Sequence, residues 1–252
     1  MSLSLYLRLT DKNRDPRSNL VLGCVMALVA GAVNAGGFLA IQKYTSHMTG
    51  IISGIADDLI VSEARLVMAG IAALACFVSG AMTTAIFINW ARRYALHSEY
   101  ALSLMLEALL LLAFGLLGAN LNVLVEVFVP TTVLLLCFIM GLQNALMTKV
   151  SKAEIRTTHM TGVVTDMGIE LGRLLYWNKS KHHPPEQNVR ANRKKLFIHL
   201  SVFISFLLGG ILGAVSFKHV GYFTTVPIAL FLMLLAAPPL FKDILSFWLN
   251  KR

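Results

Sequence analysis

The chain has 252 residues, of which 56% are hydrophobic and 14% are charged. An average soluble domain is about 45–50% apolar and about 25% charged, and a disordered chain has low hydrophobicity, so both classes are excluded. We therefore expect an all-α, polytopic membrane protein. The net charge of +9 fits basic cytoplasmic loops better than nucleic-acid binding, because no RNA- or DNA-binding motif accompanies it.

The apolar residues form segments long enough to cross a bilayer, which requires about 20 mostly apolar residues per helix. Six segments qualify, at residues 20–42, 66–90, 101–123, 128–148, 197–217 and 222–241. Pro130 fits the first turn of the fourth segment, since proline is tolerated there. Asn120 and Asn122 predict a tight turn before it. The cysteines Cys24, Cys76 and Cys137 lie within apolar runs and are expected to be packing residues.

The polar segments predict the orientation of the chain. They are the N-terminal residues 1–19 and the basic loop 176–195. All but three of the 22 Lys and Arg residues fall on the same side of the predicted spans, the exceptions being Lys43, Arg65 and Lys218. The positive-inside rule therefore places both termini and the loop in the cytoplasm.

A repeated motif divides the chain into two halves. Thr-Ser-His-Met-Thr-Gly at residues 45–50 recurs as Thr-Thr-His-Met-Thr-Gly at 157–162, and Gly-Ala-Val-Asn-Ala at 31–35 resembles Gly-Leu-Gln-Asn-Ala at 141–145. We interpret this as a duplication, with three spans in residues 20–123 and three in 124–248. Because three is odd, the halves enter the membrane with opposite orientation. Inverted repeats of this kind build many secondary transporters, with the substrate site near the midplane.

Each motif precedes a stretch that is too short for a full crossing and too apolar for an ordinary loop. Residues 44–65 and 156–176 are therefore expected to contain two short re-entrant or interfacial helices that meet near the centre. Thr45 or Ser46 is the expected N-cap of the first, and Thr157 or Thr158 that of the second. A helix N-terminus favours an anion. Alternatively, each motif only caps an interfacial helix, with its histidine bonded to a neighbouring carbonyl.

The candidate binding residues combine motif side chains, glycines that allow close approach and two asparagines within spans. They are His47, Thr49, Gly50, His159, Thr161, Gly162, Asn34 and Asn144. The asparagines could instead simply join helices, which is the commoner role of such amides.

Candidate coupling carboxylates follow the motifs or lie within a span. They are Asp58, Asp166, Glu170 and Glu107. Asp58 and Glu170 are alternatively solvated helix ends, and Glu107 is either functional or snorkelling to the membrane edge. Asp166 has Gly54 as its counterpart, so the halves are not equivalent if Asp166 acts.

An enzymatic function is the runner-up. The motif histidines and carboxylates are metal-ligand types, which leaves a membrane-embedded metal-dependent enzyme as an alternative. The sequence has none of the zinc-protease, Cys-x-x-Cys, nucleophile-elbow or P-loop spacings, so we assign no catalytic residue, metal or cofactor. A third alternative is a non-catalytic scaffold that binds partners through loop 176–195.

The paired motifs resemble the YoaK family of bacterial membrane proteins, also described as domain of unknown function 1275. The resemblance covers about residues 19–248, with the histidine motifs as its specific part. It implies a bacterial inner-membrane protein of about six helices, and it implies no activity, ligand or catalytic residue.

From the inverted repeat we expect a small secondary transporter or permease for a small polar or anionic solute. Histidine is compatible with proton coupling. The lipid bilayer is the expected partner, and a homo-oligomer is compatible with the sequence.

Overall fold

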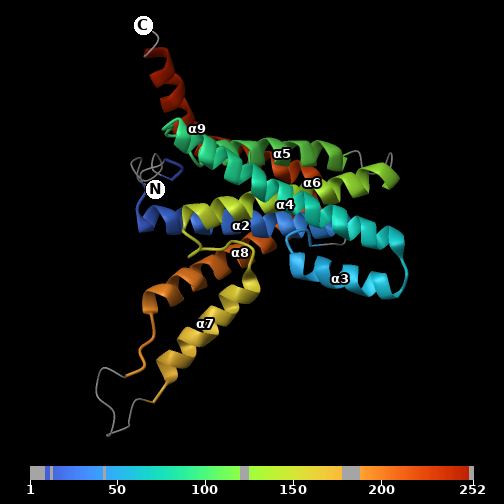
Figure 1. Ribbon diagram of the computed structural model, residues 1–252, viewed down its shortest axis with the longest axis horizontal. Coiled ribbons are helices and arrows are strands. Elements are labelled where there is room, and N and C mark those ends of the chain that lie inside the picture. Colours follow the sequence, from blue (N-terminus) through green and yellow to red (C-terminus); the bar gives the residue numbers. More distant parts are fainter. Residues whose placement is uncertain (1–8, 12–13, 42–43, 120–124, 178–187, 250–252) are drawn as a thin grey trace.

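The computed structural model describes residues 9–11, 14–41, 44–119, 125–177 and 188–249, which contain helices and no strands. The first half forms α2 (Pro16–Ile41), α3 (Met48–Ile60), α4 (Ala64–Arg93) and α5 (Ala101–Ala119). The second half forms α6 (Val125–Val150), α7 (Met160–Leu175), α8 (Arg193–Val220), the 3-10 helix η2 (Gly221–Thr224) and α9 (Thr225–Leu249) (Figure 1). Each half therefore inserts one short helix, α3 or α7, between longer ones.

Within the described residues the predicted apolar segments lie in helices, which supports a helical, multi-pass membrane protein. Four described stretches are long and apolar enough to cross a membrane, at Pro16–Leu39, Ala64–Arg93, Pro130–Val150 and Arg193–Leu249. The last stretch contains both α8 and α9, and α5 contributes a shorter apolar helix over Ala101–Leu116.

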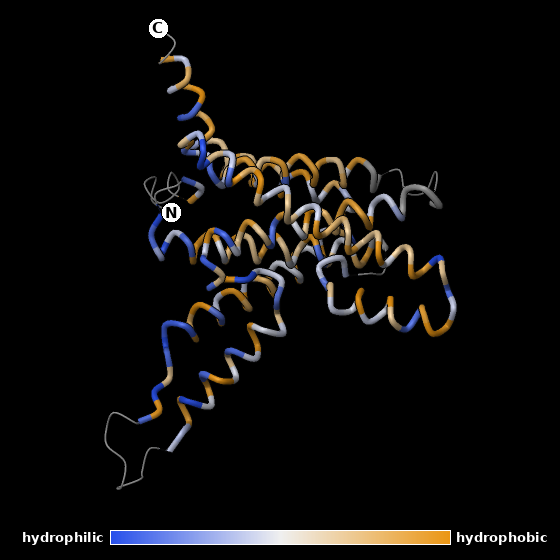
Figure 2. The backbone as a smooth tube through the Cα atoms, viewed as in Figure 1, coloured by the Kyte–Doolittle hydropathy of each residue, from blue (hydrophilic) through white to orange (hydrophobic). Residues whose placement is uncertain are grey.

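The outer faces of these helices are suited to lipid. On α8, the side chains of Leu207, Leu208, Ile211 and Leu212 are between 49% and 58% exposed. Soluble proteins rarely expose contiguous apolar surface on this scale. Figure 2 shows hydrophobic residues along the bundle and hydrophilic residues gathered at the start of α2 and where α7 and α8 leave the bundle. The apolar faces therefore contact the bilayer.

Glycines bring the backbones of α2 and α8 into contact. A Cβ atom added at Gly31 would collide with the carbonyl oxygen of Phe206, and one at Gly209 would collide with that of Leu28. Small residues at helix crossings are typical of membrane bundles, where close packing substitutes for the hydrophobic effect. This crossing has no room for a side chain at either glycine.

The same crossing occurs between α4 and α6. A Cβ atom at Gly141 would collide with the carbonyl oxygen of Phe77, and one at Gly80 with that of Phe138. Gly141 has the place in the second sequence repeat that Gly31 has in the first. Each half thus contributes one helix to each crossing.

Polar contacts fasten the first described residues to α9. Thr10 Oγ1 donates a hydrogen bond of 2.7 Å to the carbonyl of Leu235, and Lys242 Nζ lies 2.7 Å from Asp11 Oδ2. Nearby, Asp243 accepts hydrogen bonds of 2.8 Å from the backbone amides of both His97 and Ser98. One end of α9 is therefore tied to the N-terminal segment and to the α4–α5 connection.

One predicted boundary is wrong. Helix α6 begins at Val125, so Pro130 lies inside the helix rather than in its first turn. Five residues of helix precede the proline because the apolar run extends upstream of it. The predicted turn at Asn120 and Asn122 lies outside the described residues, as do residues 178–187 of the predicted loop 176–195.

Candidate functional site

After α2 the chain folds back along the helix that it has just completed. Ser46 Oγ donates a hydrogen bond of 2.9 Å to Asn34 Oδ1, although α2 continues beyond Asn34 to Ile41. At 1.5 Å per residue, the chain has therefore returned by about 10 Å before α3 begins. The short helix α3 starts beside the bundle instead of beyond its end (Figure 1).

The second half repeats this reversal. Thr158 Oγ1 donates a hydrogen bond of 2.6 Å to Asn144 Oδ1, although α6 continues to Val150. The Asn144 amide also donates to the carbonyl of Met140 at 2.8 Å, which fixes the orientation of its side chain. Each asparagine therefore binds the motif that follows its own helix, rather than joining that helix to a neighbouring one.

The residues that cap the short helices differ from those expected. The N-caps are His47 for α3 and His159 for α7, and neither side chain makes a capping hydrogen bond. Ser46 and Thr158 each lie one residue before the cap, and their hydroxyls donate to the asparagines. The first backbone bonds instead run from Ile51 N to His47 O and from Val163 N to His159 O, both at 3.1 Å.

The first threonine of each motif is buried without a hydrogen-bond partner. Thr45 is 2% exposed and Thr157 is 0% exposed, and neither Oγ1 atom has a partner within the described residues. Buried hydroxyls are usually satisfied, and an unsatisfied one costs about 1–3 kcal/mol. The two halves therefore share an unsatisfied buried hydroxyl at the same place in the motif.

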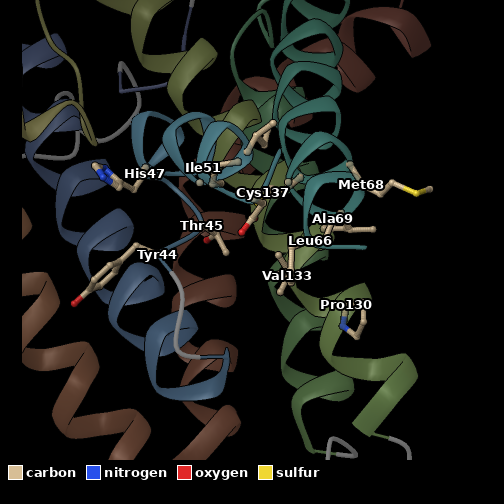
Figure 3. A pocket seen from close by; sticks show the side chains of 18 residues that line it. Tyr44, Thr45, His47, Ile51, Leu66, Met68, Ala69, Pro130, Val133 and Cys137 are labelled. Atoms are coloured by element: carbon tan, nitrogen blue, oxygen red, sulfur yellow. The ribbon is translucent and has the colours of Figure 1, made fainter. Parts of the chain in front are cut away.

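A pocket of about 720 Å³ lies beside the first motif, between α3, α4 and α6. Tyr44, Thr45 and His47 line it from the segment that precedes α3, and Ala69 on α4 and Val133 on α6 line it from another side (Figure 3). The remaining lining is mostly apolar, with Asp58 as its carboxylate: Gly50, Ile51, Gly54, Ile55, Leu66, Met68, Gly70, Ala72, Ala73, Pro130, Leu134 and Cys137. The pocket suits a solute with an apolar body and a polar end.

A smaller pocket of about 380 Å³ lies beside the second motif. Its lining is mostly polar or charged and comes from the reversal, from α7 and from the start of α8: Ala153, Glu154, Arg156, Gly162, Val163, Asp166, Asn192, Lys194, Lys195 and His199. The two linings have no residue in common. The short helices therefore line two separate pockets rather than one shared central cavity.

Asp166 is the centre of the charged pocket. Its Oδ1 atom lies 3.1 Å from Lys195 Nζ, and its Oδ2 atom lies 3.4 Å from Nε2 of the buried His199. His159 lies outside the spans and is exposed as a residue, but partial burial of its ring and the positive charge of Arg156 lower its pKa. His159 is therefore biased toward its neutral form, in which one ring nitrogen accepts a hydrogen bond.

The other candidate carboxylates differ in their surroundings. Glu170 is 1% exposed and accepts hydrogen bonds from Arg173 Nη1 at 2.8 Å and from Asn192 N at 2.7 Å, so it fastens α7 to the start of α8. Asp58 lines the large pocket and is half-buried. Glu107 lies in the core of α5, away from both pockets.

The structure separates the motif residues predicted to bind solute. His47 and Gly50 line the large pocket and Gly162 lines the small one. A Cβ atom at Gly50 would collide with the His47 ring, whereas nothing lies within 4 Å of a Cβ at Gly162.

The remaining motif residues lie on exposed surfaces. Thr49, Thr161 and His159 are exposed and line neither pocket. Side chains outside the motifs contribute instead, namely Tyr44, Cys137, Lys195 and His199. Lys195 belongs to the basic run seen in the sequence, but the other three carried no sequence signal.

The part of the chain that the structure describes contains no group of three or more His, Cys, Asp or Glu side chains placed to hold a metal ion. The metal-dependent enzyme therefore gains no support from these residues. The scaffold alternative rests on a loop that lies partly outside them.

Comparison with known sequences identifies the family. The profile described as "Protein of unknown function (DUF1275)" matches residues 22–237. The chain belongs to this family. It is also 27% identical over 160 residues to the "UPF0700 transmembrane protein YoaK" of Bacillus subtilis, a match that covers 62% of this chain and 69% of that protein. No solved structure matches the chain. The family resemblance read from the paired motifs is thus confirmed.

Proposed function

We propose that this member of the DUF1275 family is a small secondary transporter or permease. Its solute is small and carries a polar or anionic group, and it crosses the bacterial inner membrane. The observation that carries the proposal is the pair of asparagine-anchored reversals, each followed by a short helix beside a pocket. Irregular backbone at membrane depth is tolerated where it is buried or lines a cavity, and interrupted helices of this kind form transporter sites.

The proposed architecture has six spans, α2, α4, α5, α6, α8 and α9. They form inverted halves at residues 20–123 and 124–248, after a cytoplasmic segment 1–19. The paired glycine crossings and the paired asparagine bonds support this arrangement, because each contact of one half has a counterpart in the other. In Figure 1, α2 and α6 also run in opposite directions. The distribution of Lys and Arg supports cytoplasmic termini.

The proposed contacts with the solute come from both reversals. His47 and Gly50 in the first half and Gly162 in the second are proposed as direct contacts, because they line the pockets. Thr49, His159 and Thr161 are proposed to act from the same motifs at the pocket edges, and Asn34 and Asn144 by anchoring the motifs. Asp58, Asp166, Glu170 and Glu107 are the proposed coupling carboxylates. The apolar walls of the larger pocket favour a solute whose polar group is at one end.

Uptake into proteoliposomes tests the proposal. The probes are radiolabelled monocarboxylates from acetate to benzoate, with inorganic phosphate as a wholly polar comparison. The variants Ser46→Ala and Thr158→Ala each remove one anchoring hydrogen bond, and we expect uptake to fall about tenfold, the equivalent of about 1.4 kcal/mol in a barrier. Ser201→Ala is the matched control, because that hydroxyl donates only to Phe197 within its own helix.

Two results would contradict the proposal. One is uptake of no probe above that of empty vesicles. The other is equal uptake by Ser46→Ala, Thr158→Ala and the control, because the reversals would then have no part in solute movement.

A further inference from the structure

The pocket beside α7 has an excess of positive charge. Its ionisable lining consists of three bases, two carboxylates and one histidine: Arg156, Lys194, Lys195, Glu154, Asp166 and His199. Asp166 is already paired, because Lys195 Nζ lies 3.1 Å from its Oδ1 atom. Arg156 and Lys194 are exposed, and neither makes a hydrogen bond or ion pair within the described residues. Two cations of the pocket are therefore available to a ligand.

The start of α8 adds to this positive charge. Asn192 is the N-cap of the helix, and its Oδ1 atom accepts a hydrogen bond of 3.0 Å from Lys195 N. The backbone amide of Asn192 itself donates to Glu170 Oε2 at 2.7 Å. Of the four amides at a helix start that lack an intrahelical acceptor, those of Arg193 and Lys194 therefore remain. Such amides and the helix dipole favour an anion.

His199 points to a ligand independently of the helix start. It lies in the second turn of α8, is 6% exposed and lines the pocket, yet its Nε2 atom makes no hydrogen bond to any residue that the structure describes. The 3.4 Å contact of Nε2 with Asp166 Oδ2 is an ion-pair distance rather than a hydrogen bond. Buried polar atoms are usually satisfied, and a ring N–H can donate to a ligand oxygen. The pocket thus contains a buried donor without an acceptor among the described side chains.

The surface next to the pocket is suited to acyl chains. Helix α8 continues from the pocket into a stretch apolar enough to cross a membrane, and Phe197 and Leu200 are exposed on it. Basic pockets between membrane helices bind lipid headgroups that carry phosphate. A phospholipid with its headgroup in the pocket and its chains along α8 would match both surfaces.

We propose that this pocket binds an anionic phosphate group, supplied by a phospholipid headgroup or by a phosphate ion in solution. Arg156 and Lys194 pair with phosphate oxygens, and the first amides of α8 donate to them. His199 supplies a further donor from the pocket wall. Asp166 stays paired with Lys195, whose charge offsets the repulsion between this carboxylate and the ligand.

Lipid retention, measured by native mass spectrometry, tests the phospholipid source. Delipidated protein in detergent is mixed with phosphatidylglycerol or with phosphatidylcholine, whose headgroup has no net charge. We expect preferential retention of phosphatidylglycerol. Arg156→Gln and Lys194→Gln should each weaken it about tenfold, as expected for the loss of one charged hydrogen bond.

Arg65→Gln is the matched control for these variants. It removes an exposed charge from the start of α4, outside both pockets. Arg65 precedes Gly80 by as many residues as Lys194 precedes Gly209, so it has the equivalent place in the first half. We expect its retention of phosphatidylglycerol to equal that of the wild type.

Equilibrium dialysis with radiolabelled inorganic phosphate tests the solution source. Binding of phosphate that Arg156→Gln and Lys194→Gln weaken, without retention of phosphatidylglycerol, would support the site and identify a free phosphate as its ligand. Retention of the lipid without binding of phosphate would support the site and identify a headgroup.

Three results would overturn the inference. One is that neither probe binds. Another is equal binding by the wild type, Arg156→Gln, Lys194→Gln and Arg65→Gln, because the pocket would then have no part in it. The third is equal retention of phosphatidylcholine and phosphatidylglycerol without binding of inorganic phosphate, because negative charge would then not be recognised.

The inference rests on the proposed function only in that Gly162 of the same pocket is a proposed solute contact. Its outcome is separate from that of the uptake assay. If a phosphate group binds and no solute is taken up, the transport proposal fails and the phosphate site stands. If uptake occurs and neither probe binds, the transporter stands and the phosphate site is lost.

Discussion

The pocket beside α3 and the pocket beside α7 share a backbone arrangement but have walls of opposite chemistry. Each follows an asparagine-anchored reversal and the first turn of a short helix. The first is large and mostly apolar, whereas the second is smaller and contains Asp166, Lys195 and His199. The shared backbone and the divergent lining suggest that the two halves have the same backbone arrangement but different functions.

The glycine crossings allow α4 and α8 to be aligned residue by residue, so that their contributions to the two pockets can be compared. The carbonyl of Phe77 on α4 contacts Gly141 as the carbonyl of Phe206 on α8 contacts Gly31, and Gly80 corresponds in the same way to Gly209. In that alignment Lys195 stands where the first half has Leu66, and His199 where it has Gly70. Asp166 replaces Gly54 in the repeated motif. The first half thus offers apolar contact surface, and the second concentrates charge.

The largest effects should come from the crossings, which the two halves share. Gly31→Ala and Gly141→Ala should each lower the free energy of unfolding by about 1–3 kcal/mol, because the added methyl collides with a backbone carbonyl. This corresponds to a fall in Tm of roughly 2–4 °C per kcal/mol, measured by thermal unfolding in detergent. Gly210→Ala is the control, since its nearest neighbour is Gly31 O at 3.8 Å. Sensitivity at only one of the two crossings would break the equivalence of the halves.

The anchoring asparagines should differ in degree. Asn144→Ala removes a buried amide with two hydrogen bonds and should cost about 1–3 kcal/mol. Asn34 is only half-buried, so Asn34→Ala should cost about 0.5–1.5 kcal/mol. Thr165→Ala, which removes an exposed hydroxyl bound within its own helix, is the control. Chemical denaturation measures all three, and a costlier Asn34→Ala would reverse the ranking.

The positive charge of Arg156 in the second pocket should be measurable as a shift in the pKa of His159. Partial burial and, to a lesser extent, the charge of Arg156 lower the pKa of His159, so Arg156→Ala should raise that pKa toward the ordinary value of about 6.5 while burial keeps it below. In the wild type the neutral ring is favoured on folding, so its contribution to stability is complete above pH about 6.5 and is lost as the pH falls below it. Imidazole NMR signals report the titration. An unchanged pKa in Arg156→Ala would show that burial alone is responsible.

The smallest contrast concerns the motif glycines. Gly162→Ala meets open space and should stabilise α7 by up to about 1 kcal/mol through helix propensity. Gly50→Ala should lose that gain, because the methyl displaces the His47 ring. Thermal unfolding of both variants checks the sign of the difference. Equal stabilisation would mean that His47 moves aside without cost.

The helices and the family could be predicted from the sequence because long apolar runs and a repeated six-residue motif are local signals. The boundary at Pro130 was missed because the helix gains apolar residues upstream that outweigh one lost hydrogen bond. The N-caps were missed for a different reason. Ser46 and Thr158 have good capping side chains, but the asparagine contact of the preceding helix fixes where the chain turns, and each short helix starts one residue later.

The candidate site was only partly predictable, since burial and pairing depend on tertiary packing. Asp58 and Glu170 occupy equivalent positions in the repeat, yet Asp58 lines a pocket and Glu170 fastens two helices. Nothing in their local sequence distinguishes them. His199 likewise lies within an apolar run, and its proximity to Asp166 follows from how α7 packs on α8.

The glycine crossings also limit how the bundle can move. Because the backbones are in direct contact, without side chains between them, we expect α2 with α8 to move as one rigid pair and α4 with α6 as another. Each pair contains one helix from each sequence repeat. In the proposed transport function, exposing a pocket to each side of the membrane in turn would therefore require the α2–α8 pair to rock against the α4–α6 pair. The parts that move would then not be the two halves related by the sequence repeat.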